Sequence, residues 1–273
     1  MHKIVVCLCS LLSLLLLSLS SCTEFVRIQK TTDSSLKYEY AKKYYHSREY
    51  SKAIDLLQDV VPILNGTADG PESLYLLADS YYKDSRPIAA SDFFVRYYNS
   101  YPKGEKAEEA RYKAAMGFYQ ASPEARLDQS STYEAIREMQ AYLDFYPTGQ
   151  YVTEVRQMLF SLQDKLAYKE YLNALLYYDL GLYMGNNYRS CIITAKEALK
   201  DYPYTKYRED FFFLILKASY KEASFSVNEK IQTRYRDVLD RYYAYINEYP
   251  AGKYLRDAKL IYEAVSKHIS KNA

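Results

Sequence analysis

The chain has 273 residues, a formal net charge of +2 at pH 7, and 34 tyrosines among an aromatic content of 16%. This near-neutrality argues against a nucleic-acid partner, because domains that bind nucleic acid usually carry a strongly basic face. Glycine and proline number only 8 each, a scarcity that suits helices joined by short turns.

The first 21 residues are predicted to be a signal peptide. His2 and Lys3 precede an apolar run, Ile4–Leu19, that is too short for a stable membrane span. The run ends in Leu19-Ser20-Ser21-Cys22, which resembles a bacterial lipobox, so Cys22 is the predicted lipidation site. The alternative is ordinary secretory cleavage near Ser20-Ser21, with Cys22 incidental.

The other cysteines limit what the mature chain can build. Cys7 and Cys9 lie in the predicted signal peptide, so a lipidated Cys22 leaves Cys191 without a disulfide partner. One free cysteine and the few histidines do not make a zinc site, and we expect no metal and no cofactor. Residues 22–35 are polar and without periodicity, so they are predicted to be a tether between lipid and folded body.

From Leu36 onward the apolar pattern is helical and repeats. Tetratricopeptide units are helix pairs of about 34 residues, with small residues where the helices cross and Pro after the second helix. The second unit of the chain fits best, and the first and fourth agree in part. The residues that carry the pattern are Tyr40, Ala41, Tyr44, Tyr50, Ala53 and Leu57; Leu74, Leu77, Ala78, Tyr81, Ala90, Phe94 and Pro102; and Cys191, Ala195, Ala198 and Pro203.

The predicted fold class is therefore all-α: an α-solenoid of about five tetratricopeptide-like helix pairs, with a capping helix over Lys253–Ile269. We divide it into N-terminal repeats over 36–147 and C-terminal repeats with the cap over 148–273. Longer loops are expected over 122–130 and near 222–228. The stretch Tyr151–Met184 is too long for an ordinary helix, so an extra helix is predicted there.

A Tyr-Pro dipeptide recurs at Tyr101, Tyr146, Tyr202 and Tyr249, and Gly follows two residues after Pro in three of the four copies. We interpret each copy as the joint between one helix pair and the next, with Pro ending a helix and Gly allowing the reversal. The third copy departs from this pattern, since Tyr204-Thr205 replaces the x-Gly.

Together, the lipobox, the short tether, five helix pairs and the three Y-P-x-G segments resemble the BamD family of outer-membrane assembly lipoproteins. The segments are FVRYYNSYPKG (94–104), YLDFYPTG (142–149) and YINEYPAG (245–252). The resemblance implies a lipid-anchored scaffold in the outer membrane, facing the periplasm, that helps to fold and insert β-barrel proteins. It implies that the N-terminal repeats bind unfolded barrel substrates and that the C-terminal repeats dock the periplasmic domains of BamA. Thr23, after the cysteine, is compatible with delivery to the outer membrane.

No catalytic constellation is found in the sequence, and we expect no enzyme. His46 and His268 are interpreted as solvated helix-end residues. The acidic residues Glu105, Glu108 and Glu109 suit the positive end of a helix that begins after Pro102.

Binding residues are expected on the first helix of each pair, where certain positions normally face a concave groove. Tyrosines there would add apolar area at small entropy cost, together with a hydroxyl for hydrogen bonding. The alternative is that these rings only fill the contacts between helices. The candidates are Tyr38, Lys42, Tyr45, Tyr75, Asp79, Tyr82 and Lys113.

Two other functions fit a helical-repeat lipoprotein. One is an adaptor that docks envelope hydrolases or division proteins to the outer membrane. The other is a glycan-capturing surface lipoprotein, which usually carries large insertions and exposed Trp, and Trp is absent here.

Overall fold

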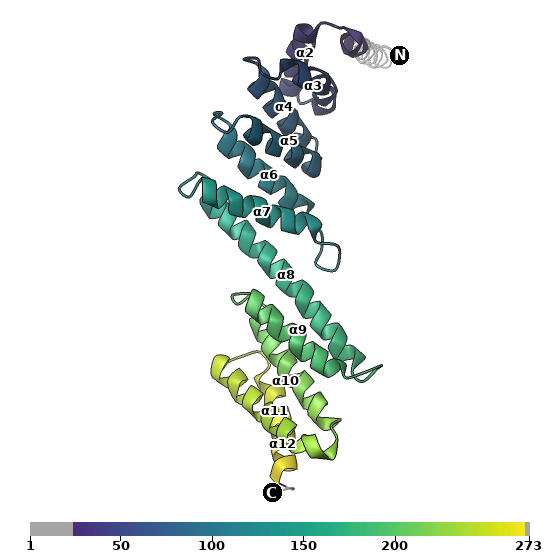
Figure 1. Ribbon diagram of the computed structural model, residues 1–273, viewed down its shortest axis with the longest axis vertical. Coiled ribbons are helices and arrows are strands. Elements are labelled where there is room, and N and C mark those ends of the chain that lie inside the picture. Colours follow the sequence, from purple (N-terminus) through teal and green to yellow (C-terminus); the bar gives the residue numbers. More distant parts are fainter. Residues whose placement is uncertain (1–23, 271–273) are drawn as a thin grey trace, which may run out of the picture. The chain divides into compact units, whose positions relative to one another are not determined.

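The computed structural model describes residues 24–270, and all of its regular structure in that range is α-helical. After a short helix over 24–30, eleven helices follow within the described residues. Figure 1 labels these helices in chain order. They are α2 (Ser34–His46), α3 (Tyr50–Leu64), α4 (Gly70–Lys83), α5 (Pro87–Ser100), α6 (Ala107–Ala121), α7 (Ser130–Phe145), α8 (Val152–Leu180), α9 (Asn187–Asp201), α10 (Arg208–Ser224), α11 (Asn228–Glu248) and α12 (Leu255–Ser270). The five predicted pairs are α2–α3 to α10–α11, and the predicted cap is α12, so the all-α fold class is confirmed.

The helices belong to two compact units. Unit 1 holds 24–122 and 130–156 of the described residues, and unit 2 holds 123–129 and 157–270. The predicted boundary at 147/148 thus differs from the boundary between the units, which falls inside α8. The predicted loop after α6 belongs to unit 2.

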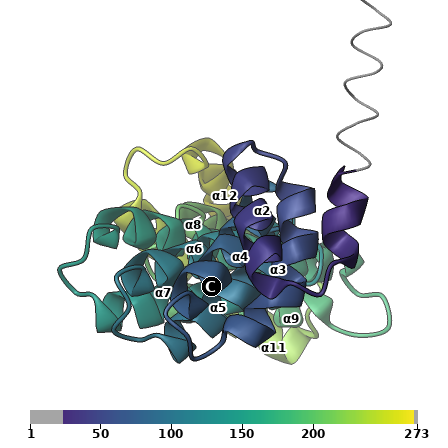
Figure 2. The same cartoon turned by 90° about the horizontal axis from the view of Figure 1, so that it is seen from above.

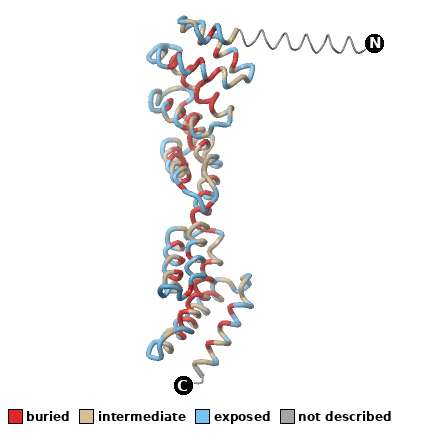
Figure 3. Tube along the Cα trace, turned by 90° about the vertical axis from the view of Figure 1, so that its right-hand side faces the viewer, coloured by how far each residue is buried: buried red, intermediate tan, exposed pale blue. Residues whose placement is uncertain are grey.

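Small residues lie where paired helices cross, as the repeat pattern predicts. In unit 1, Ala41 and Ala53 are buried in the first pair and Ala78 and Ala90 in the second. In unit 2, Cys191 is buried beside the alanines of α9, within a core that α8 and α10 complete. Buried residues, red in Figure 3, run through each unit. A continuous core of this kind arises because a single helix pair cannot cover its own apolar face.

At the Tyr-Pro joints, a buried tyrosine seven residues before the glycine makes hydrogen bonds through its hydroxyl. Tyr142 donates its hydroxyl hydrogen bond to Glu108 Oε1 (2.7 Å) and accepts one from the backbone N–H of Tyr151 (3.0 Å). A Cβ on Gly149 would lie 2.4 Å from Glu108 Oε1 and 2.5 Å from the Tyr142 hydroxyl, so only glycine leaves room for this arrangement.

The last joint repeats the arrangement in unit 2. Tyr245 donates to Glu209 Oε1 (2.8 Å) and accepts from the backbone N–H of Tyr254 (3.1 Å). A Cβ on Gly252 would meet the same two groups at 2.6 and 2.7 Å. The Y-P-x-G motif therefore has a structural reason in each unit.

The third copy, which lacks the glycine, makes equivalent bonds with a different side chain. Ala198 stands where the other joints have Tyr, and Thr205 stands where they have Gly. The Thr205 hydroxyl donates to Asp164 Oδ1 (2.7 Å) and accepts from the backbone N–H of Tyr207 (3.3 Å). The joint therefore keeps equivalent hydrogen bonds, although Ala stands in place of Tyr and Thr in place of Gly.

Stacked rings reinforce three of the joints. Tyr112 stacks on Tyr151 with ring centroids 3.9 Å apart, and Phe213 stacks on Tyr254 at 4.3 Å. Tyr168 and Tyr207 stack at 4.9 Å. Many of the tyrosines therefore connect one helix pair to the next.

Two expectations about single segments are wrong. Residues 24–30, predicted to belong to an irregular tether, form a helix whose Ile28 is buried in the core of unit 1 and whose Phe25 packs edge-on against Tyr44. This helix lies beside α2 and α3 in Figure 2. Its apolar residues, spaced three apart, are enough to bind one side of a short helix to the repeats.

The second wrong expectation is the extra helix predicted within 151–184, which is not present. The stretch forms one helix of 29 residues, α8, which ends at Gly181 in a left-handed conformation with φ of 56°. No Pro or Gly interrupts Val152–Leu180, so nothing in the sequence breaks the helix.

The signal peptide and Cys22 lie outside the described residues. Among residues 24–270 we find no helical stretch with the length and hydrophobicity that crossing a bilayer requires.

Candidate functional site

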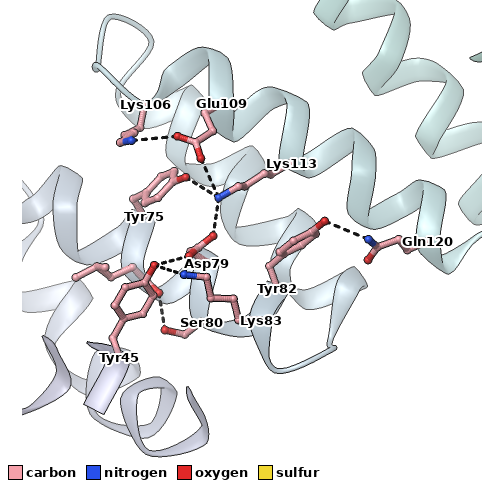
Figure 4. Close-up of polar contacts among 11 residues, drawn as sticks. Tyr45, Tyr75, Asp79, Ser80, Tyr82, Lys83, Lys106, Glu109, Lys113 and Gln120 are labelled. Carbon is pink, nitrogen blue, oxygen red and sulfur yellow. Dashed lines mark hydrogen bonds and ion pairs between the residues drawn. The ribbon is translucent and has the colours of Figure 1, made fainter. Parts of the chain in front are cut away.

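Polar side chains connect the first helices of three successive pairs in unit 1. We call the surface of α2, α4 and α6 that carries them the first-helix face. Tyr45 on α2, Asp79 on α4 and Lys113 on α6 occupy equivalent positions 34 residues apart. The Tyr45 hydroxyl donates to Asp79 Oδ2 (2.5 Å), and Lys113 Nζ donates to Asp79 Oδ1 (2.7 Å). Figure 4 shows this ladder, which follows directly from the repeat length.

Asp79 is the centre of the ladder. Its side chain is only 3% exposed and also pairs with Lys83 at 2.9 Å. Burial raises the pKa of this carboxyl, but the hydrogen bonds from Lys113, Tyr45 and Lys83 outweigh burial, so its pKa lies below the ordinary value of 3.8. A buried carboxylate with this many donors is a satisfied charge rather than a reactive one.

Glu109 extends the network on α6. It pairs with Lys113 at 2.9 Å and with Lys106 at 3.1 Å. Although burial opposes its ionisation, bonds from Lys113 and other neighbours lower its pKa to about 2. Lys113 therefore lies between two carboxylates, and its own pKa is raised by them against the effect of burial.

Aromatic rings surround the charges. Lys113 Nζ donates to the Tyr75 hydroxyl (2.9 Å), and Gln120 Nε2 donates to the Tyr82 hydroxyl (3.1 Å). Tyr75 packs edge-on against Phe94, with ring centroids 5.7 Å apart. Burial, first of all, raises the pKa values of Tyr45 and Tyr75, so both hydroxyls stay protonated. These rings pack against neighbouring residues and are also partly exposed at the surface.

The structure brings together five of the seven predicted groove residues: Tyr45, Tyr75, Asp79, Tyr82 and Lys113. Tyr38 differs from the expectation that it lines an open groove. It is 3% exposed, and its hydroxyl donates to Glu72 Oε2 (2.8 Å), 34 residues away. Lys42 stays at the surface, paired with Glu39 at 2.7 Å and placed over the Tyr38 ring.

Sequence reasoning missed two members of the network, Lys83 and Glu109. Lys83 lies four residues after Asp79 on α4, which is the spacing of a helical ion pair. Glu109 lies 34 residues after Tyr75, so aligning the repeats would have found it. Glu109 was instead interpreted only as a favourable charge at a helix start.

The remaining candidates take no part in the polar network of the first-helix face. Cys191 is buried, and burial first of all raises the pKa of its thiol to about 12, as expected for an inert packing residue. The rings of His46 and His268 lie beside Tyr45 and Tyr235 respectively. Within residues 24–270, no group of His, Cys, Asp and Glu side chains could hold a metal ion.

The chemistry that the first-helix face offers is that of a binding surface. Its rings and paired charges offer apolar area and hydrogen bonds to an extended chain. Its central carboxylate is already occupied by donors from all three helices.

We compared the chain with curated protein sequences, with solved structures and with models of protein families. No curated protein sequence matches the chain significantly. Two crystal structures of kinesin light chain TPR-like repeats from Podosopora anserina, one of them a point variant, are similar at 14% and 15% identity with TM-scores of 0.32 and 0.31. Each match covers 80% of this chain and 98% of the other, and likeness at this level adds nothing to the fold already described.

The third comparison, with models of protein families, is the informative one. The model of the YfiO family, described as outer membrane lipoprotein, matches residues 30–230. That range takes in the helix pairs of unit 1, the pair α8–α9 and the helix α10. The chain therefore belongs to the YfiO family of outer membrane lipoproteins.

Proposed function

We propose that this protein is a lipid-anchored periplasmic scaffold of the outer-membrane β-barrel assembly machinery, which binds BamA and unfolded barrel substrates and promotes their folding and insertion. The observation that carries the proposal is the family match over residues 30–230, on a chain whose described part holds five successive helix pairs. Anchoring is assigned to acyl chains on Cys22, and each buried CH₂ of an acyl chain contributes about 0.8 kcal/mol to membrane binding.

Substrate binding is assigned to unit 1. The half-buried rings of Tyr45, Tyr75 and Tyr82 and the amine of Lys42 remain partly accessible on the first-helix face. An extended, unfolded segment could lay apolar side chains on these rings and hydrogen-bond to the hydroxyls. Tyr38 and Asp79 support this surface from below, because they are buried.

BamA docking is assigned to unit 2, where two loops expose an apolar tip. We use that name for Leu182, Tyr183, Met184, Phe225 and Val227, of which Met184 is 90% exposed and Tyr183 68%. The loops are held together by a hydrogen bond from Asn186 to Glu222 (3.1 Å) and by stacking of Tyr188 on Phe225. Exposed aromatic and Met side chains on a fixed support are typical of the centre of a protein interface.

Co-purification tests the proposal. The full-length protein with a C-terminal tag is expressed in its own cells, membranes are solubilised in mild detergent, and the recovered partners are identified by mass spectrometry. We expect a large barrel protein with repeated periplasmic domains. Recovery of a peptidoglycan hydrolase in its place would favour the adaptor function and contradict ours.

A matched pair of variants makes the test specific to the docking surface. Tyr183→Ser together with Met184→Ser removes most of the exposed apolar tip and should reduce the recovery of the barrel protein. Tyr133→Ser removes a ring that is 58% exposed on α7 of unit 1 and should leave recovery unchanged. Equal recovery with both variants would remove the apolar tip from the proposal.

A further inference from the structure

The helix over 24–30 fastens the start of the described chain to unit 1. It lies at the N-terminal end of that unit (Figure 1), with Ile28 buried in the core. The Glu24 carboxylate accepts a hydrogen bond from the Tyr40 hydroxyl (2.8 Å), and the Lys43 amine lies 3.7 Å from it. Because both partners belong to α2, these contacts fix the first turn of the helix on the repeats.

Very little chain separates this helix from the predicted lipidation site. Cys22 precedes Glu24 by two residues, and consecutive Cα atoms are 3.8 Å apart, so the two Cα atoms are separated by at most about 7 Å. The headgroup layer of a bilayer is itself about 5–7 Å thick on each side. Acyl chains on Cys22 therefore hold the first turn of the helix at the headgroups, and the end of unit 1 stays beside the bilayer.

The side of the helix that faces away from unit 1 is basic and partly apolar. Arg27 and Lys30 are exposed, and Val26 beside them is 43% exposed. Neither cation makes a hydrogen bond or an ion pair through its side chain within residues 24–270. Asp33, the first carboxylate after the helix, caps α2 by accepting from the backbone N–H of Leu36 (3.0 Å). The outward side thus presents two positive charges and an apolar side chain that no other part of the described chain uses.

We propose that the outward side of the helix over 24–30 lies on the bilayer, with Arg27 and Lys30 among the anionic headgroups of phospholipids and Val26 at the depth of their glycerol groups. The inference rests on the proposed function, because it takes the acyl chains on Cys22 as the anchor. A basic residue is attracted to an anionic leaflet within about a Debye length, about 8 Å at physiological ionic strength, and the short link to Cys22 keeps the helix in that range.

The contact orients unit 1. Acyl chains hold a protein at a membrane, yet they leave it able to turn about the anchor. A second contact a few ångströms away, on a helix that is fastened to α2, presents the same end of unit 1 to the bilayer at all times. The first pair, α2–α3, is then the part of unit 1 nearest the headgroups.

Quenching by labelled lipids tests the contact on the full-length lipoprotein in vesicles. Gln29→Cys places a fluorescent label on the exposed side of the helix, and a small share of the lipids carries a nitroxide on the headgroup. We expect strong quenching in vesicles of equal parts phosphatidylcholine and phosphatidylglycerol, and weaker quenching in phosphatidylcholine alone. Cys191 is buried, so the label reacts at the introduced thiol. Lys103→Cys, at an exposed position of a joint in unit 1, carries the label for comparison and should be quenched little.

A matched pair of double variants separates this helix from charge in general. Arg27→Gln with Lys30→Gln should shift the equilibrium away from the bilayer about thirtyfold, because each basic residue near an anionic surface contributes about a factor of five. Quenching should then fall to the level seen in phosphatidylcholine. Arg96→Gln with Lys103→Gln removes the same charge from exposed positions elsewhere in unit 1 and should leave the quenching at Gln29→Cys unchanged.

Three results would overturn the contact: equal quenching in neutral and anionic vesicles, quenching that Arg27→Gln with Lys30→Gln does not reduce, or quenching at Gln29→Cys no stronger than at Lys103→Cys. Quenching that BamA in the same vesicles abolishes would assign the outward side to a protein partner instead.

Flotation of the vesicles separates the contact from the anchor. Protein that floats with the vesicles but is not quenched contradicts the contact alone, whereas protein that does not float contradicts both the anchor at Cys22 and the contact. Recovery of the barrel protein by co-purification depends on neither readout, so the failure of this contact is distinguishable from the failure of the proposed function.

Discussion

Replacing Tyr142 by Phe removes a single oxygen from the joint between the third and fourth helix pairs. The ring is fully buried and keeps its packing. Two hydrogen bonds are lost: the one donated to Glu108 Oε1 (2.7 Å) and the one accepted from the backbone N–H of Tyr151 (3.0 Å). The change therefore isolates the contribution of the hydroxyl to the joint.

The expected cost follows from what remains after the change. Glu108 still accepts a hydrogen bond from the backbone N–H of Gln150 (2.8 Å), so its carboxylate keeps one donor. Hydrogen bonds to a charged group are worth about 1.5–3 kcal/mol, and leaving a partner unsatisfied adds to the loss. We expect the free energy of unfolding to fall by about 2 kcal/mol. The thermal midpoint should fall by roughly 5 °C.

Urea denaturation of the full-length protein in detergent, followed by circular dichroism, measures this change, and two other Tyr→Phe variants serve as controls. The Tyr44 hydroxyl is buried and has no hydrogen-bond partner among the described residues, so Tyr44→Phe should be neutral or stabilising. The Tyr97 hydroxyl lies beside Gly104 at the equivalent position of the first joint, where Glu105 and Glu109 act on its pKa only through their charges, so Tyr97→Phe should cost less than Tyr142→Phe, about 1 kcal/mol. If Tyr142→Phe were as stable as the wild type, or if Tyr44→Phe lost as much as Tyr142→Phe, the reasoning about the joint would be refuted.

Three further predictions concern acid, the exchanged joint and the buried thiol. The pKa values of Asp79 and Glu109 are lowered from 3.8 and 4.5, the latter to about 2, so these groups bind protons less readily in the folded chain. Their contribution to the free energy of unfolding is complete above about pH 4.5 and is lost as the pH falls towards 2. Urea denaturation between these pH values should show that the free energy of unfolding changes less with pH in Asp79→Asn than in the wild type. Thr205→Val keeps the shape of the side chain but removes its bond to Asp164, and should destabilise unit 2 by about 1–3 kcal/mol in calorimetry, whereas Thr205→Ser should not. Cys191 is buried with its thiol pKa raised to about 12, so a thiol reagent at pH 8 should label it only after unfolding; rapid labelling of the native protein would contradict its packing role.

The repeat architecture could be predicted because it depends on local patterns. The spacing of Ala78, Ala90 and Pro102 identifies a helix pair, and the Tyr-Pro copies mark where pairs join. Whether an exchanged joint still works could not be predicted from spacing alone. At this joint the hydroxyl comes from Thr205, because position 198 is Ala where the other joints have Tyr. Only the folded structure shows that the Thr205 hydroxyl reaches a carboxylate, that of Asp164, as the tyrosine hydroxyls of Tyr142 and Tyr245 do at their joints.

Burial was harder to predict than helix formation. Tyr38 and Tyr45 both lie on the first-helix face by position, yet Tyr38 is covered and Tyr45 is half-exposed, because the difference depends on what α4 places beside them. The helix over 24–30 was missed because its apolar residues are few, and it gains its stability from packing on unit 1. The long α8 was divided in the prediction because helices of 29 residues are uncommon in globular domains.

The most direct test of the proposed function is assisted folding of an outer-membrane barrel protein in proteoliposomes that contain BamA. The folded fraction is followed over time by its resistance to heat in gel electrophoresis. We predict faster folding when the full-length lipoprotein is incorporated with BamA, and a smaller gain when the apolar tip carries Tyr183→Ser and Met184→Ser. An unchanged rate with the wild-type protein, while it is bound to the same vesicles, would contradict a role in barrel assembly.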